Sequence, residues 1–200
     1  TANMSQEQLA SEFVVFPCFT RPWFFQAEGN WDILAPFRFR LVSGWWGIGC
    51  DANGTPQLAG LASILALCRD RGYPCDIVLD PARAAAFALG DREELFLHNA
   101  EGGWSPGGNC HNTVSIWHPE IRRLGARFVE RVASQLAAES SVLSYEMTNE
   151  PSLTIERHEH GYDYRPAGVG GYEPSAVTAW HAWLEARHGG LAQLNRRWRT

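Results

Sequence analysis

Lysine is absent from this sequence of 200 residues, and all 17 basic side chains are arginines. Arginine can replace lysine as a generic surface charge, so this absence is typical of a GC-rich coding sequence and not of one function. The net charge of −5 and the lack of a basic run argue against a nucleic-acid partner. No apolar run approaches the ~20 residues of a membrane-spanning helix. We therefore expect neither nucleic acid nor a membrane as partner.

Paired cysteines are also missing. The five cysteines are odd in number, unevenly spaced and never in a CxxC pair: Cys18, Cys50, Cys68, Cys75 and Cys110. Neither a disulfide framework nor a structural zinc site is therefore indicated. Buried free thiols fit best, and they favour a reducing, cytoplasmic location.

Motifs for cofactors and metals are lacking as well. No GxGxxG follows the first apolar run and no GxxxxGK[ST] occurs, so nucleotide binding is unsupported. A metal-dependent hydrolase is the first rival hypothesis, because His158-Glu159-His160 and His111 offer ligands. HExxH and the PCxxC half of the deaminase signature are absent, however. We expect no metal and no cofactor.

Tryptophan is abundant by contrast, with nine residues, several of them in Gly- and Pro-rich segments. Loop aromatics can serve as platforms for flat ligands such as sugars, and tryptophan also fills cores. Composition leaves both readings open.

Short apolar runs alternate with amphipathic helices along the chain. The runs predict strands at 13–16, 37–43, 75–79 and 141–148, and the 3.6-residue period predicts helices at 57–71, 119–138, 174–187 and 191–198. Gly72 stops the helix at 57–71 and Gly189 the helix at 174–187, and Pro119 and Pro174 start the helices at 119–138 and 174–187. Repeated βα units of this kind predict a parallel sheet.

Two long segments without periodicity, 81–117 and 152–173, follow the third and fourth predicted strands and are expected to be loops. In a (β/α)8 barrel the loops after the strands build the active site. We therefore predict an α/β fold of one domain over 1–200, namely a TIM barrel with about its first four βα units present.

Asn149-Glu150 directly follows the fourth predicted strand. Cleaving a glycosidic bond needs one carboxyl group to protonate the leaving oxygen and a second to act at the anomeric carbon. A neighbouring amide can bind the sugar 2-hydroxyl. As a bare dipeptide Asn-Glu is weak, and a solvated loop glutamate is then the simpler reading.

Longer stretches resemble clan A glycoside hydrolases. Ser144–Pro151 is similar to their fourth-strand motif, and Arg40–Trp46 with Gly54 is similar to their second strand. Trp183–Thr200 resembles the "WL…YG…L..LN..WGT" stretch of glycoside hydrolase family 42, the β-galactosidases, and Glu94–Asn112 resembles that family's loop after strand three more loosely. Together the resemblance covers about residues 13–200.

The resemblance implies a retaining β-glycosidase in which Glu150 is the acid/base and Asn149 binds the 2-hydroxyl. Arg40 would orient the nucleophile, or close the barrel interior as an ion pair. Trp46 would line the cleft, or fill the core. Glu146 lies four residues before Glu150 on the same strand face and is interpreted as a buried, Arg-paired residue deeper in the barrel.

In this clan the nucleophile is a glutamate at the end of strand seven. A barrel of eight βα units typically needs ~250 residues, and the four units predicted here do not include strand seven. We therefore expect these residues to be the front half of a longer enzyme, inactive alone. Tyr145, Pro151 and the lack of a cysteine cluster depart from family 42, and Pro151 is common in family 5 cellulases and mannanases. A family 5-like β-glycanase, or a non-catalytic sugar-binding half-barrel, stays an alternative. A homo-oligomer is left open.

Overall fold

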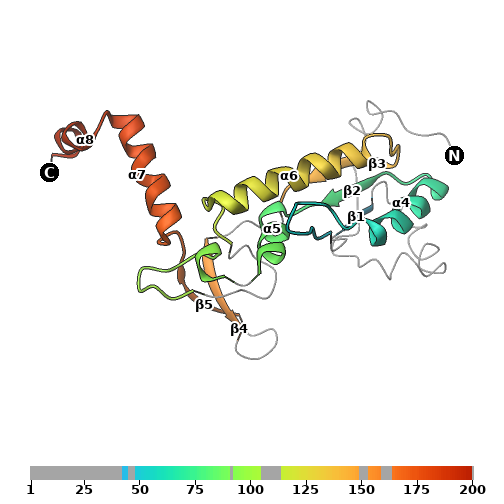
Figure 1. The fold of residues 1–200 in the computed structure, drawn as a ribbon, viewed down its shortest axis with the longest axis horizontal. Helices are drawn as coiled ribbons and strands as arrows, with labels where there is room; N and C mark the ends of the chain where they lie inside the picture. The colour runs from blue at the N-terminus through green and yellow to red at the C-terminus, as the bar shows by residue number, and fades with distance from the viewer. Residues whose placement is uncertain are drawn as a thin grey trace. The chain divides into compact units, whose positions relative to one another are not determined.

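The computed structural model of the chain describes residues 42–44, 48–90, 92–104, 114–148, 153–158 and 164–199. The chain divides into two compact units (Figure 1). Unit 1 comprises Thr1–Ala88 and Gly125–Asn149, and unit 2 comprises Leu89–Leu124 and Glu150–Thr200. Each unit is described by itself.

A parallel sheet of three described strands forms the centre of unit 1. The strands are β1 (Val42–Gly44), β2 (Cys75–Val78) and β3 (Val142–Glu146), and they lie side by side in chain order. Cys75 pairs with Val42 on one side and with Val142 on the other. The predicted strands at 75–79 and 141–148 are confirmed, whereas the run at 13–16 and most of that at 37–43 lie outside the described residues.

Helix α4 (Ala59–Arg71) connects β1 to β2, and the prediction for 57–71 is confirmed to within two residues. The predicted apolar face is buried: Leu61, Ile64, Leu65 and Cys68. Gly72 ends the helix with a φ of 70°, a left-handed conformation that costs glycine little, and its N–H caps the last turn.

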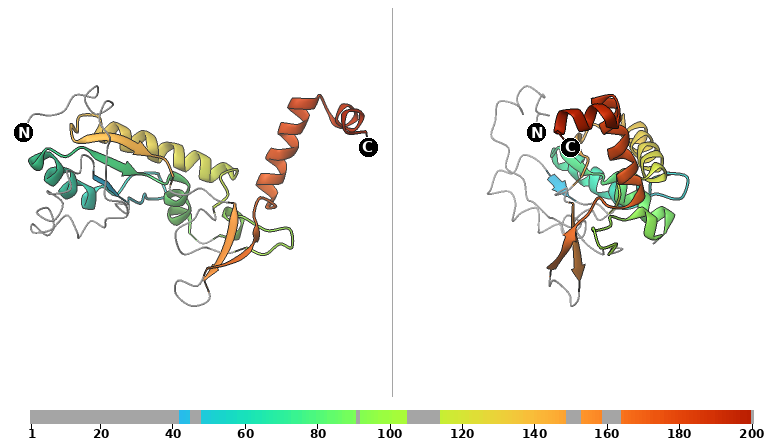
Figure 2. Two further views of the ribbon diagram at one scale, coloured as in Figure 1. Left: turned by 180° about the vertical axis from the view of Figure 1, so that it is seen from behind. Right: turned by 90° about the vertical axis from the view of Figure 1, so that its left-hand side faces the viewer.

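Helix α6 (Pro119–Leu136) precedes β3, and its amphipathic pattern predicted it correctly. Phe128 and Val132 are fully buried in the part that belongs to unit 1. Because right-handed crossovers join parallel strands in sequential order, α4 and α6 cover the same side of the sheet (Figure 2). Among the described residues, neither crossover helix lies on the opposite side of the sheet.

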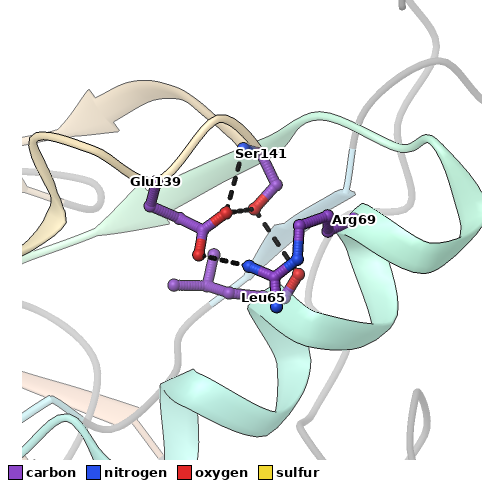
Figure 3. Close-up of polar contacts among 4 residues, drawn as sticks. All are labelled: Leu65, Arg69, Glu139 and Ser141. Carbon is purple, nitrogen blue, oxygen red and sulfur yellow. Dashed lines mark hydrogen bonds and ion pairs between the residues drawn. The ribbon is translucent and has the colours of Figure 1, made fainter.

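A polar cluster joins the two crossovers at the amino-terminal ends of β2 and β3 (Figure 3). Arg69 of α4 binds the Glu139 carboxylate at 2.7 Å, and the Ser141 hydroxyl donates to the same carboxylate at 2.9 Å. Burial alone would raise the pKa of Glu139, but the hydrogen bonds from Ser141 and the Arg69 charge outweigh it, so the pKa lies below its ordinary value. The ionised form is therefore the one that holds the cluster together.

The expectation of an irregular loop over 81–117 is wrong at its beginning. Residues Pro81–Leu89 form helix α5, and Glu93–Leu95 form a short 3-10 turn, η2. Proline suits the first helical position and alanine has the highest helix propensity. Ala84, Ala85 and Ala86 are buried. The composition that was interpreted as a loop is thus that of a small-residue helix packed in the core.

The expectation of a loop over 152–173 is also wrong. Strands β4 (Thr154–His158) and β5 (Tyr164–Val169) pair as an antiparallel hairpin in unit 2, with Thr154 opposite Val169 and His158 opposite Tyr164. Threonine, tyrosine and valine favour strands, but the many charged residues between them obscured any alternation in the sequence.

Helices α7 (Pro174–His188) and α8 (Leu191–Trp198) end the described chain. Both predictions are confirmed, and Gly189 and Gly190, with φ of 73° and 101°, make the turn between them. Among the described helices, none combines the length and the apolar character that a bilayer crossing requires.

Candidate functional site

The sheet of unit 1 has one face toward the helices and one polar face. The Cys75 thiol contacts Cys68 of α4, and this hydrogen bond together with burial raises its pKa. Because side chains alternate along a strand, Asp76 and Val78 point to the other face. There the Ser144 hydroxyl of β3 donates a hydrogen bond of 2.5 Å to the Asp76 carboxylate. Register places Glu146 beside Val78, on the same face.

Glu146 is the last residue of β3 and lies near the carboxyl end of the sheet. Burial, followed by the negative charge of Asp76, raises its pKa. We interpreted Glu146 as an Arg-paired residue deep in a barrel. Among the described residues its electrostatic neighbours are the carboxyl groups of Asp76 and Asp80, and an arginine partner from the segments outside the described residues stays a prediction.

Asp80 lies just beyond the carboxyl end of β2 and is 3% exposed. Its φ of 45° is left-handed, a conformation that aspartate adopts more readily than most residues other than glycine. One carboxylate oxygen, Oδ1, is buried and accepts no hydrogen bond from the residues that the structure describes. Burial raises the pKa of Asp80 to about 6; the charge and backbone N–H of Arg83 oppose the rise and the charge of Glu146 adds to it.

Asp80 and Glu146 lie at the edge where the parallel strands end, and Asp76 lies within β2 on the face that Glu146 shares, so the three carboxyl groups form a cluster. Open edges of this kind carry the active sites of α/β barrels. Acids with raised pKa values in a cleft are candidates for proton transfer, because they can hold a proton close to neutral pH. The negative charges of Asp76, Asp80 and Glu146 therefore favour the protonated form of a carboxyl group placed near them.

The four residues singled out from the sequence, Arg40, Trp46, Asn149 and Glu150, lie outside the described residues. Strand β3 ends at Glu146, and the described residues that follow it end at Thr148, two positions before Glu150. The location of Glu150 is therefore known here only from the sequence, as four residues after Glu146.

Sequence analysis did not identify Asp76 as a site residue. The signal was present, because an acid inside the buried run Cys75–Val78 has to be hydrogen-bonded or serve a purpose. Asp80 carried a weaker signal, an acid placed between a buried strand and Pro81. From the sequence alone, neither signal shows whether the acid has a structural role, such as capping a helix, or a functional one.

Unit 2 holds a buried carboxylate of a different kind. Glu173, which is fully buried, precedes α7 and accepts hydrogen bonds from the Ser115 hydroxyl at 2.6 Å and from the His98 backbone N–H at 3.2 Å. These bonds join three distant segments, so Glu173 stabilises unit 2. Glu101 lies exposed in a turn whose backbone N–H groups bond to the Asn99 side chain.

Metal ligands were the basis of the rival hypothesis. His158 is the last residue of β4, and Glu159, His160 and His111 lie outside the described residues. Within the described ranges no group of three or more histidine, cysteine, aspartate or glutamate side chains is placed to hold a metal ion. The thiols of Cys50, Cys68 and Cys75 are free and buried, as expected.

Comparison with protein-family models finds no match, and no curated protein matches the sequence. Solved structures do match the fold. A β-galactosidase from Halorubrum lacusprofundi has a TM-score of 0.65 at 20% identity, and one from Rahnella sp. R3 has 0.68 at 14%. The catalytic domain of a β-amylase from Paenibacillus polymyxa has 0.62 at 12%.

The matches cover nearly all of this chain and a minor part of the others. They span 93% of the chain and 27% of the Halorubrum protein, 92% and 26% for the Rahnella protein, and 92% and 50% for the amylase domain. At these identities the likeness concerns the fold. The chain has the fold of part of a TIM-barrel glycosidase.

Proposed function

We propose that these residues belong to a retaining glycoside hydrolase that acts on β-linked carbohydrate, with Glu150 as its general acid/base. The observation that carries the proposal is the place of Asn149-Glu150 in the sequence, three and four residues after the end of β3, which is a parallel strand in a fold that matches solved glycosidases. Carboxyl ends of barrel strands are where catalytic residues lie.

The carboxyl cluster supports the proposed role of Glu150. A general acid must keep its proton near the working pH, and nearby negative charges favour the protonated form. Glu146 precedes Glu150 by four residues, and its own pKa is raised by burial and by Asp76. The same field would raise the pKa of an acid placed beside it.

The remaining roles follow from the chemistry of glycoside cleavage. Asn149 is proposed to bind the sugar 2-hydroxyl, a contact that strengthens as positive charge develops on the sugar. Arg40 is proposed to orient the nucleophile carboxylate, and Trp46 to line the cleft. No cofactor is needed for this reaction.

The substrate is proposed to be a β-galactoside, because two of the matched structures are β-galactosidases. Aryl β-galactosides, β-glucosides and β-mannosides assayed side by side with the full-length protein identify the sugar. A preference for the glucoside or mannoside would favour the β-glycanase alternative. Binding of all three without hydrolysis would favour a sugar-binding role.

Glu150→Gln tests the acid directly. In the full-length protein we expect kcat/KM to fall by about 10²–10⁴-fold on alkyl glycosides, which need protonation of the leaving oxygen. Dinitrophenyl glycosides need little such help and should lose far less. Glu130→Gln, at an exposed position of α6, is the matched control and should leave both rates unchanged. Equal losses on both substrate types would mean that Glu150 is not the acid.

A further inference from the structure

Asp80 is a buried acid whose structural role accounts for only part of its chemistry. Its carbonyl accepts the N–H of Ala84 at 3.0 Å, and its carboxyl group accepts a hydrogen bond from the N–H of Arg83. These are the contacts of an N-cap residue at the start of α5. An asparagine would cap the helix as well and would tolerate the φ of 45° without placing a negative charge in the interior. An acid at this position therefore indicates a purpose beyond the cap.

The Oδ1 atom of Asp80 is the part of the side chain that the cap does not use. It is buried, and among the described residues it accepts no hydrogen bond. A buried acceptor without a donor costs free energy, so such a group calls for an explanation. Residues other than glycine with a left-handed φ also gather at functional sites. Two independent features of Asp80 thus point to a function of its charge.

The charges that act on Asp80 come from the elements packed around it. Burial raises its pKa to about 6; the cation of Arg83 on α5 opposes the rise, and the carboxylate of Glu146 on β3 adds to it. Asp76, on the same strand as Asp80, acts on Glu146 in turn. Helix α6 contacts the turn after Asp80 through Gly125, which has no side chain. Asp80 is therefore largely ionised at neutral pH and largely neutral in mild acid.

The pairing of β2 with β3 brings Asp80 close to the residues that follow β3. The Leu79 N–H donates to the Glu146 carbonyl at 2.9 Å, and by the same register Asp80 is level with Thr148. Neighbouring strands are about 5 Å apart, and each residue of chain spans at most about 3.6 Å. Because Glu150 is two residues after Thr148, the length of the chain alone keeps its Cα atom within about 12 Å of that of Asp80.

We propose that Asp80 is a positioning residue of the candidate site, whose ionised carboxyl group keeps the proton on Glu150 and so sets the alkaline limit of activity. This role rests on the proposed function of Glu150 as the general acid. A nearby negative charge favours the protonated form of a second carboxyl group, which is the form that a general acid must have. In mild acid Asp80 is itself neutral, so its influence is confined to the alkaline side of the pH profile.

The pH dependence of kcat/KM in the full-length protein tests this role, with an alkyl β-glycoside as substrate. Asp80→Asn should move the alkaline limb to lower pH by about 0.5–1 unit, as expected for one charge at this distance in a protein. The profiles of parent and variant should converge on the acidic side. With a dinitrophenyl glycoside, which needs little protonation, the shift should be absent. Asp70→Asn, exposed near the end of α4, is the matched control and should leave the limb in place.

Should the asparagine variant misfold, Asp80→Gly also suits the left-handed φ, lacks the charge and should give the same shift. A kcat/KM that falls equally at every pH overturns the proposal, because a structural role alone has that effect. So does an equal shift with the dinitrophenyl glycoside, since the limb then does not report the acid. Failure of the proposed function is visible separately, as equal losses of Glu150→Gln on both substrates. A loss of Glu150→Gln confined to the alkyl glycoside, with an unmoved limb in Asp80→Asn, would keep the acid and refute the role of Asp80.

Discussion

Asp80 illustrates how the end of a single strand can hold a carboxyl group in its neutral form. Its burial raises the pKa to about 6, above the value of an aspartate in an unfolded chain, so the folded state binds a proton that the unfolded state releases. The resulting stabilisation is fully present below the unfolded-state pKa and is lost as pH rises through about 6.

Asp80→Asn should therefore stabilise the chain at alkaline pH. Asparagine keeps the size of the side chain, tolerates the left-handed φ and needs no proton. We expect the free energy of unfolding to rise by about 1–3 kcal/mol near pH 8, and the gain to shrink toward zero below about pH 4. Urea denaturation at several pH values measures it. Asp70→Asn, at an exposed site on α4, should change little, and a gain independent of pH would contradict the account.

At the scale of elements, the connection between α4 and β3 depends on the cluster of Arg69, Glu139 and Ser141 (Figure 3). Its position at the amino-terminal ends of the strands, away from the carboxyl cluster, is the side of an α/β barrel that serves stability. The same sheet thus separates a stabilising edge from the candidate functional edge.

Glu139→Gln should weaken this connection. The pKa of Glu139 is lowered on folding, so its contribution is present above the unfolded-state pKa and disappears as pH falls through the folded-state pKa. Because Arg69 is half exposed, solvent screens the pair and we expect a loss of about 1 kcal/mol at neutral pH. Denaturation of the variant at neutral and acidic pH checks both the size and the pH dependence. Glu130→Gln, exposed on α6, is the control; an equal loss there would show a general charge effect.

At the scale of the whole molecule, the chain spans 26–50% of the solved glycosidase chains that it matches. A retaining mechanism needs two carboxyl groups about 5–5.5 Å apart, one as acid/base and one as nucleophile. The activity is accordingly proposed for the protein as a whole.

We expect the 200 residues alone to show no turnover of aryl β-glycosides. An acid without a nucleophile protonates the leaving oxygen but leaves the oxocarbenium-like charge at the anomeric carbon unsupported. Steady-state assays with high protein concentration measure this, and the full-length protein is the positive control. Hydrolysis by the short chain that disappears in Glu150→Gln would place both carboxyl groups within it, and Asp80, Glu101 and Glu146 would become the candidate partners.

Much of the fold follows from local sequence. The helices α4, α6, α7 and α8 begin and end close to where proline, glycine and the 3.6-residue period predict, because these signals act within one or two turns. The strands β2 and β3 follow from short, largely apolar runs between such helices, of which the run of β2 is fully buried and that of β3 is half-buried. In α5 and the β4–β5 hairpin the local signals were ambiguous, and packing decided the outcome.

For the site, the sequence by itself supplied Asn149-Glu150 and its place after a strand, since both depend on neighbouring residues alone. Only the tertiary structure decided that Asp76, Ser144 and Glu146 share the sheet face opposite the helices. Only it decided that Asp80 is buried, that one of its oxygens has no hydrogen-bond partner among the described residues, and that burial raises its pKa to about 6. The pKa of Asp80 depends on its burial and on the charge of Glu146, which lies about 65 positions away in the chain. Folding alone brings such distant residues together, so the local sequence does not predict the pKa.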